Sequence, residues 1–191
     1  LLLKMVEEKG QVKVPTPTSD RWTHVVRTLP PKSAEQKAQI QQRVQKLTQV
    51  VEGARSPDLA RGRELFQKSC GLCHSVGKES AGFGPSLSGS KNRTTDAVLN
   101  AVIDPSQAVE SVFRTYHVET VEGETYDGFF GDETADALVL KFMGGTQQSV
   151  PFKQIKSAGY VDGSSVMPEG LLDGLSDAQV ADLIRYVQSL Q

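Results

Sequence analysis

The chain has 191 residues, of which 38% are hydrophobic and 23% are charged, with 21 Lys and Arg against 23 Asp and Glu. These proportions are ordinary for a soluble globular protein and exclude collagen-like, fully disordered and coiled-coil classes. A net charge of −2 argues against nucleic acid as the main partner, and no apolar run is long enough for a transmembrane helix. Two cysteines are too few for a disulfide scaffold or a four-thiolate metal site.

The first 56 residues carry ten basic and five acidic groups, whereas residues 161–191 have a net charge of −4. A proline-rich start predicts an extended arm. A helix over 33–53 should follow, with Ser33 and Gln36 as a capping box and Gly53 as the C-cap. This helix could be a solvated linker or a docked element. The basic region could pack against the acidic C-terminal part.

Two further helices are expected before the chain changes its pattern. Ser56 and Pro57 suit the N-cap and first position of a helix that runs toward Cys70. Gly62 interrupts that helix, so a close packing partner is a plausible reason for it. After a Gly- and Pro-rich loop, a short helix is expected over 95–103.

Residues 112–160 alternate between apolar and polar side chains with a period of two, which predicts strands. The expected strands are 112–120, 125–130, 137–143 and 149–152, in a compact antiparallel unit. The last segment returns to the helical period, and Ser176 with Gln179 forms a second capping box.

Residues 70–74 read Cys-Gly-Leu-Cys-His, which is the pattern of c-type haem attachment. Two thiols three positions apart can each form a thioether with one haem vinyl group, and His74 can then ligate the iron from the same side. A thioredoxin-like dithiol is a weaker alternative, because the helix precedes the cysteines here. A zinc site would need a fourth ligand from His24, His117 or a carboxylate.

The sixth position of the iron decides between electron transfer and ligand chemistry. The candidates are Met5, Met143, Met167, His24 and His117. Met167 is favoured because Pro168 prevents a helix there, which keeps this methionine on a loop that can reach a buried cofactor. A loop methionine without a haem motif would more often be a packing residue.

The order of these motifs resembles class I cytochrome c. The matching stretches are Gly62–Phe66, Cys70–His74, Gly84–Leu87, Met167-Pro168 and Leu175–Tyr186. The segments 104–116 and 121–128 are similar to the haem-binding domain family of the planctomycete and verrucomicrobia type. In that family a β-rich insertion separates the cysteine motif from the methionine ligand.

The resemblance implies a role for each matching residue. Cys70 and Cys73 would hold one haem c, with His74 and Met167 as axial ligands. The Pro85 carbonyl would accept the His74 ring N–H, and Arg93 would approach a haem propionate. A solvated arginine is the ordinary alternative for Arg93.

The expected fold is a mainly α cytochrome c fold (class I-like), with a small antiparallel β insertion and a helical N-terminal extension. Residues 1–56 would form the extension, 57–111 and 161–191 the cytochrome c domain, and 112–160 the insertion. Gly62 and Phe66 would cross the C-terminal helix near Tyr186. The haem pocket would be lined by apolar residues such as Leu65, Phe66, Leu87, Leu99 and Leu183.

The expected function is one-electron transfer by a mono-haem carrier that is not itself an enzyme, as a module of a larger exported redox protein. Its partner would be a redox protein or a fused dehydrogenase, in the periplasm or otherwise exported. Two alternatives remain. One is a haem sensor or peroxidase-like domain with a labile sixth ligand, and the other is an interaction module built on the β insertion.

Overall fold

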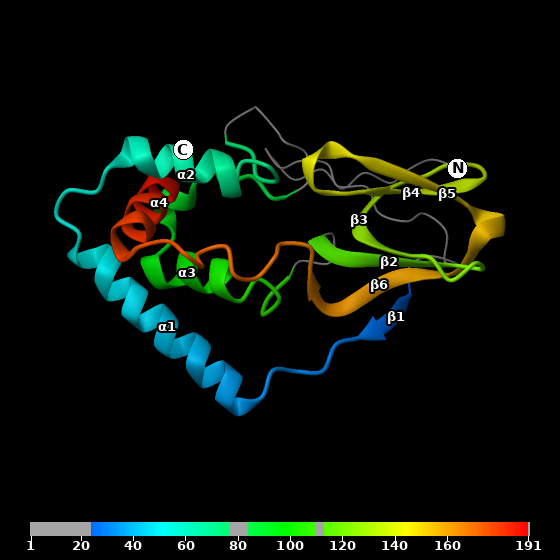
Figure 1. The fold of residues 1–191 in the computed structure, drawn as a ribbon, viewed down its shortest axis with the longest axis horizontal. Helices are drawn as coiled ribbons and strands as arrows, with labels where there is room; N and C mark the ends of the chain where they lie inside the picture. Colours follow the sequence, from blue (N-terminus) through cyan, green and yellow to red (C-terminus); the bar gives the residue numbers. More distant parts are fainter. Residues whose placement is uncertain (1–23, 77–83, 110–112, 191) are drawn as a thin grey trace. The chain divides into compact units, whose positions relative to one another are not determined.

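The computed structural model describes residues 24–76, 84–109 and 113–190, which belong to two compact units (Figure 1). The helical unit comprises residues 31–81, 86–108 and 167–191, and the strand-rich unit comprises residues 1–30, 82–85 and 109–166. The elements of the helical unit are α1 (Ala34–Gly53), α2 (Leu59–Ser69), η2 (Ser90–Asn92), α3 (Thr95–Ile103) and α4 (Asp177–Ser189).

Side-chain caps define the ends of the helices. Ser33 and Gln36 form the expected capping box of α1, although the C-cap is Ala54 and Gly53 is still helical. The cap of α2 is Asp58 rather than Ser56, because the Asp58 carboxylate accepts the Arg61 amide at 3.0 Å. A carboxylate at this position also suits the positive end of the helix dipole.

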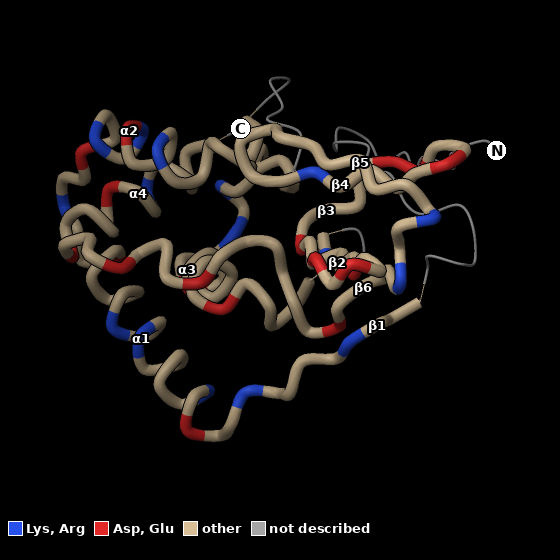
Figure 2. Tube along the Cα trace, turned by 45° about the vertical axis from the view of Figure 1, so that its right-hand side comes forward, with Lys and Arg blue, Asp and Glu red and all other residues tan. Residues whose placement is uncertain are grey.

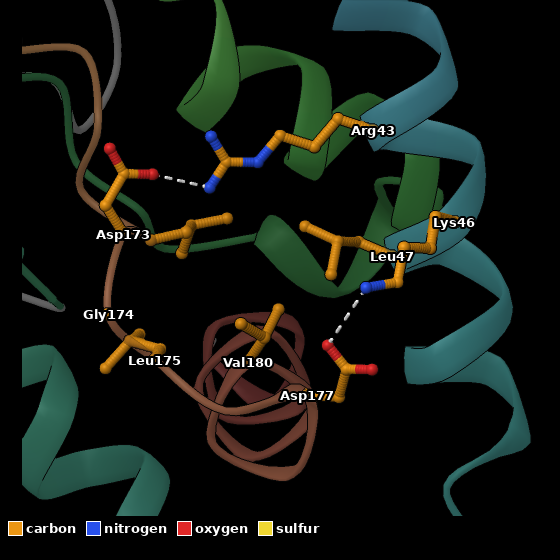
Figure 3. A pocket seen from close by; sticks show the side chains of 9 residues that line it. Arg43, Lys46, Leu47, Asp173, Gly174, Leu175, Asp177 and Val180 are labelled. Carbon is orange, nitrogen blue, oxygen red and sulfur yellow. Dashed lines mark hydrogen bonds and ion pairs between the residues drawn. The ribbon is translucent and has the colours of Figure 1, made fainter.

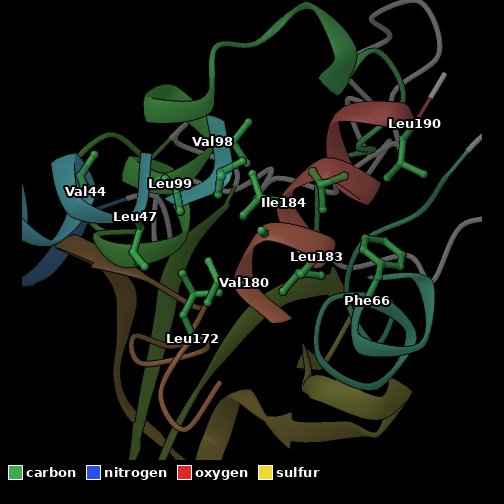
Figure 4. Packing of buried hydrophobic residues seen from close by; sticks show 13 residues of the cluster. Val44, Leu47, Phe66, Val98, Leu99, Leu172, Val180, Leu183, Ile184 and Leu190 are labelled. Atoms are coloured by element: carbon green, nitrogen blue, oxygen red, sulfur yellow. The ribbon is translucent and has the colours of Figure 1, made fainter. Parts of the chain in front are cut away.

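One apolar core joins the four α-helices of the helical unit (Figure 4). The helices meet along the apolar stripes that the sequence pattern indicated, and each buried Leu, Ile, Val or Phe contributes about 1.5–3 kcal/mol. The buried members are Val44, Leu47, Val51, Phe66, Val98, Leu99, Leu172, Val180, Ala181, Leu183, Ile184, Val187 and Leu190.

α2 and α4 cross closely at Gly62. A Cβ atom built on Gly62 would lie 2.3 Å from the Asp182 carbonyl oxygen and 2.8 Å from the Tyr186 Cβ. One turn further along α2, the Phe66 and Tyr186 rings pack with their centroids 5.5 Å apart. The helix-breaking tendency of Gly62 is therefore offset by a backbone contact that no other residue allows.

The strand-rich unit contains a six-stranded mixed sheet in the order β1-β6-β2-β3-β4-β5. β1 is parallel to β6, and the other neighbouring pairs are antiparallel. The strands are β1 (Val25–Thr28), β2 (Arg114–Thr120), β3 (Thr125–Glu133), β4 (Ala137–Lys141), β5 (Gln147–Pro151) and β6 (Ile155–Ser165), with the short turns η4 (Met143–Gly145) and η5 (Phe152–Gln154).

β3 belongs to both halves of this sheet. Its first half pairs with β2 through residues 125–128, and its second half pairs with β4 through residues 129–133. The register shifts between Phe130 and Asp132, which marks a bulge at Gly131. The inward face forms a second core, in which Tyr116, Val118, Leu138, Leu140 and Ala158 are fully buried.

The expected fold class is wrong in one respect. The chain is not mainly α with a small antiparallel insertion, because the six-stranded sheet is a full unit and includes a parallel pair. β1 lies in the region expected to be an extended arm, and β6 was not expected as a strand. The expected domain borders at residues 57, 112 and 161 stay a prediction. The division of the chain into compact units places α1 in the helical unit.

The crossing of α2 and α4 can be tested with Gly62→Ala. The added methyl group collides with backbone of α4, so we expect the free energy of unfolding to fall by about 1–3 kcal/mol in urea denaturation. Gly53→Ala is the matched control, because nothing lies within 4 Å of a Cβ built at that helical position. The control should be neutral or slightly stabilising. Equal effects of the two substitutions would contradict the close crossing.

Candidate haem-attachment site

A tight turn at the end of α2 carries both cysteines. The Cys70 amide continues the helix by donating to the Phe66 carbonyl at 2.8 Å. The Cys70 carbonyl then accepts the amides of Cys73 at 3.1 Å and His74 at 2.8 Å. This turn draws the backbones of the two cysteines together and leaves His74 at its exit, which is the arrangement that two thioethers and an adjacent iron ligand require.

The two thiols are free and half-buried. Burial raises the pKa of Cys70 to about 11, with a smaller contribution from the nearby Cys73, and burial also raises the pKa of Cys73. A redox-active dithiol needs the opposite shift, toward a stable thiolate at neutral pH. The surroundings of this pair therefore do not favour the thioredoxin-like alternative.

The turn lies against the apolar core of the helical unit. Cys70, Leu65 and Leu87 are half-buried and pack against that core, to which Phe66, Leu99 and Leu183 belong. All the apolar residues expected around the cofactor are thus in one cluster. Beyond His74, the Ser75 carbonyl accepts the Leu87 amide at 2.9 Å, which ties the motif to the segment before η2.

The candidates for a sixth ligand divide between the two units. Met167 is half-buried and belongs to the helical unit together with Cys70, Cys73 and His74. The other described candidates belong to the strand-rich unit: His24 is exposed, Met143 is 52% exposed, and the His117 Nδ1 lies 2.6 Å from an Asp127 carboxylate oxygen. Met5 lies outside the described residues.

Two further residues were expected to contact the haem. Pro85 is half-buried and is grouped with the strand-rich unit, so its contact with the His74 ring stays a prediction. Arg93 follows η2 with an exposed side chain, and its backbone carbonyl accepts a hydrogen bond from the Gln188 side chain of α4 at 3.2 Å. Its role toward a propionate also stays a prediction.

A buried carboxylate that the sequence analysis did not single out holds α2 in place. Asp182 lies on α4 and is 2% exposed. One of its oxygens accepts the Asp58 backbone amide at 2.7 Å, and the other accepts from the Arg61 guanidinium. Its partners are more than 120 residues away in the chain. For that reason no local pattern in α4 could have identified it.

Among the residues that the structure describes, no three His, Cys, Asp or Glu side chains are placed to hold a metal ion together. The described part of the chain therefore offers no zinc site at the cysteine motif. The same part contains no helix that is long and apolar enough to cross a membrane.

The strand-rich unit contains a hollow of about 450 Å³ beside the end of β6. Its lining combines hydroxyl groups and a carboxylate with the Phe142 and Met143 side chains. The Thr115 and Ser164 hydroxyls in it lie 2.9 Å apart, and Asp127 is held by His117.

The clamp at Asp182 can be tested with Asp182→Asn. The amide keeps the shape but accepts through one oxygen only, so its NH2 would face either the Asp58 amide or the Arg61 guanidinium, donor against donor. We expect a loss of about 1–3 kcal/mol in the free energy of unfolding. Glu64→Gln on exposed α2 surface is the control, with an expected change within about 0.5 kcal/mol. A substitution at Asp182 that is as silent as the control would show that the clamp does not stabilise α2.

Comparison with known proteins agrees with the motif. A family model described as cytochrome c matches residues 59–144, a range that includes α2 and the Cys70–His74 turn and ends before Met167. No curated protein matches the chain. The match indicates a cytochrome c domain, and domains of this family carry covalently bound haem c, generally act as electron carriers rather than enzymes, and are typically extracellular or periplasmic.

Proposed function

We propose that the chain is a mono-haem c-type cytochrome that transfers single electrons through a haem with His74 and Met167 as axial ligands. The observation that carries this proposal is the turn at residues 70–74, which presents two free thiols and a histidine beside an apolar core. The family match over the same residues supports it. The likeness to the planctomycete and verrucomicrobia type of haem-binding domain is part of the proposal.

The residues present fit a covalently held haem. Thioether formation needs two unpaired thiols close together, and both cysteines are free, with burial raising the pKa of each. The adjoining core supplies the dry surroundings that such a cofactor needs. A histidine and a methionine in the same unit supply the nitrogen and sulfur donors.

When bound, the haem iron supplies a one-electron couple, and a methionine ligand raises its reduction potential. The residues of the chain would hold the haem and shield it from water. Cys70 and Cys73 would anchor the group, the end of α2 would place His74, and the Pro85 carbonyl would accept its ring N–H. Arg93 would neutralise a propionate. Core side chains such as Phe66 would exclude water, which would reduce the solvent rearrangement that accompanies a change of oxidation state.

We further propose that this module belongs to a larger exported redox protein and exchanges electrons with a partner protein or a fused dehydrogenase. Support comes from the typical extracellular or periplasmic location of cytochrome c domains. The haem sensor or peroxidase-like alternative requires a labile sixth ligand. It therefore makes the opposite prediction for Met167.

Covalent attachment is tested by Cys70→Ser and Cys73→Ser, alone and together, in cells that carry a cytochrome c maturation system. The wild-type chain should gain the mass of one haem on intact mass spectrometry, because two thioethers serve one macrocycle. The double variant should carry none. A wild-type chain without haem, or haem retained covalently by the double variant, would contradict the proposal.

Methionine ligation is tested by Met167→Ala, with Met143→Ala as the matched control on an exposed methionine. The oxidised protein should show a weak band at the red edge of the visible spectrum, which only Met167→Ala abolishes. The same substitution should lower the reduction potential by on the order of 0.1 V, within the span of about 0.8 V that axial ligands cover. An unchanged spectrum would assign the sixth ligand elsewhere and revive the sensor alternative.

A further inference from the structure

We propose that Lys32 is a positioning residue for the methionine ligand: its ammonium clamps the segment 167–176, called the ligand loop below, to the end of α3. This inference rests on the proposed role of Met167. It assigns a function to the N-terminal extension, which the cytochrome c match does not include.

Lys32 joins two carboxylates that come from different parts of the helical unit. Its Nζ donates to the Asp104 Oδ1 at 2.9 Å and to the Glu169 Oε1 at 2.9 Å. Asp104 is the C-cap of α3, and Glu169 follows Met167 by two residues. A single ammonium therefore ties the ligand loop to a fixed helix end.

The ligand loop has little internal structure to hold it. Its backbone hydrogen bonds are short-range turns, from the Asp173 amide to the Gly170 carbonyl at 2.8 Å and from the Leu175 amide to the Leu172 carbonyl at 3.3 Å. Leu172, at 4% exposure, is its one residue in the buried core. Leu172 lies beyond Glu169, so the Lys32–Glu169 pair is the contact of this loop with the extension that is closest in sequence to Met167.

The basic extension makes two further ion pairs with this region (Figure 3). Arg43 Nη2 lies 2.7 Å from the Asp173 Oδ1, and Lys46 Nζ lies 3.6 Å from the Asp177 Oδ1, on either side of a hollow of about 250 Å³. Two basic side chains of α1 thus pair with acidic ones, as the charge pattern suggested. Figure 2 shows where the charged positions lie along the chain. The helix is docked, and the solvated-linker alternative is wrong.

Burial decides which of these pairs matters most. The Arg43–Asp173 and Lys46–Asp177 side chains are 40–67% exposed, and such pairs contribute little because water and salt screen them. The Lys32–Glu169 pair is also partly screened, since Glu169 is 57% exposed, but its ammonium is already held by Asp104. Asp104 is only 7% exposed, so loss of Lys32 would also leave a buried carboxylate unpaired. Hydrogen bonds to Glu169 and then Asp104 raise the pKa of Lys32, which keeps it charged.

The test uses the haem-loaded full chain and the affinity for added imidazole, which competes with Met167 for the iron. We expect Lys32→Met to bind imidazole about tenfold more tightly than wild type, because the methionine end of the loop detaches more easily. Glu169→Gln should give a smaller increase, since it removes only the loop's side of the clamp. Lys37→Met removes the same charge from an exposed position of α1 and should leave the affinity unchanged.

A second readout needs no haem: hydrogen exchange of the peptide 167–176 in the apoprotein should be faster in Glu169→Gln than in Lys37→Met. Because Glu169 is 57% exposed, this variant decides the matter even if Lys32→Met fails to fold. The clamp would be overturned if Glu169→Gln bound imidazole as wild type does and exchanged the amides of the peptide 167–176 no faster than Lys37→Met. Absence of the methionine band from the wild-type protein would instead overturn the proposed ligation itself.

Discussion

The crossing of α2 and α4 is the contact on which the helical unit depends. It brings two helix backbones to a distance that only a glycine at position 62 allows. Asp182 adds a polar contact at the same place, since its carboxylate accepts hydrogen bonds from the Asp58 amide and the Arg61 guanidinium at the start of α2. The aromatic pair of Phe66 and Tyr186 continues the contact toward the cysteines. Together they fix both the position and the direction of α2.

The direction of α2 matters because the cysteine turn is its continuation. The amide of Cys70 still belongs to the helix, and its carbonyl closes the turn that ends at His74. A shift of α2 would therefore move the thiols and the histidine as one body. The segment 167–176, which carries the proposed methionine ligand, is built differently: it has no regular structure, Leu172 packs it against the core, and Lys32 links its Glu169 to Asp104. Of the two proposed ligands, His74 follows a packed helix, whereas Met167 begins a loop.

Local chemistry explains which parts of this fold could be predicted. The capping boxes at Ser33 and Ser176 and the helix over 95–103 depend on neighbouring residues, and all were confirmed. β6 was missed because its Gly159 and Gly163 lower strand propensity. Gly159 is there for a distant reason: a Cβ at this position would lie 2.4 Å from the His24 carbonyl oxygen beside β1. β1 itself is a strand only because β6 offers it a parallel partner.

For the site, the cysteine motif was readable because its spacing is dictated by one cofactor, whereas Asp182 and Lys32 act on partners far along the chain. The most direct test of the account is a potentiometric titration of the purified full chain, followed through its visible spectrum. The account predicts one reversible one-electron step per chain, with low-spin, six-coordinate iron in both oxidation states. A chain without haem, or a reduced form with an open sixth position, would contradict it.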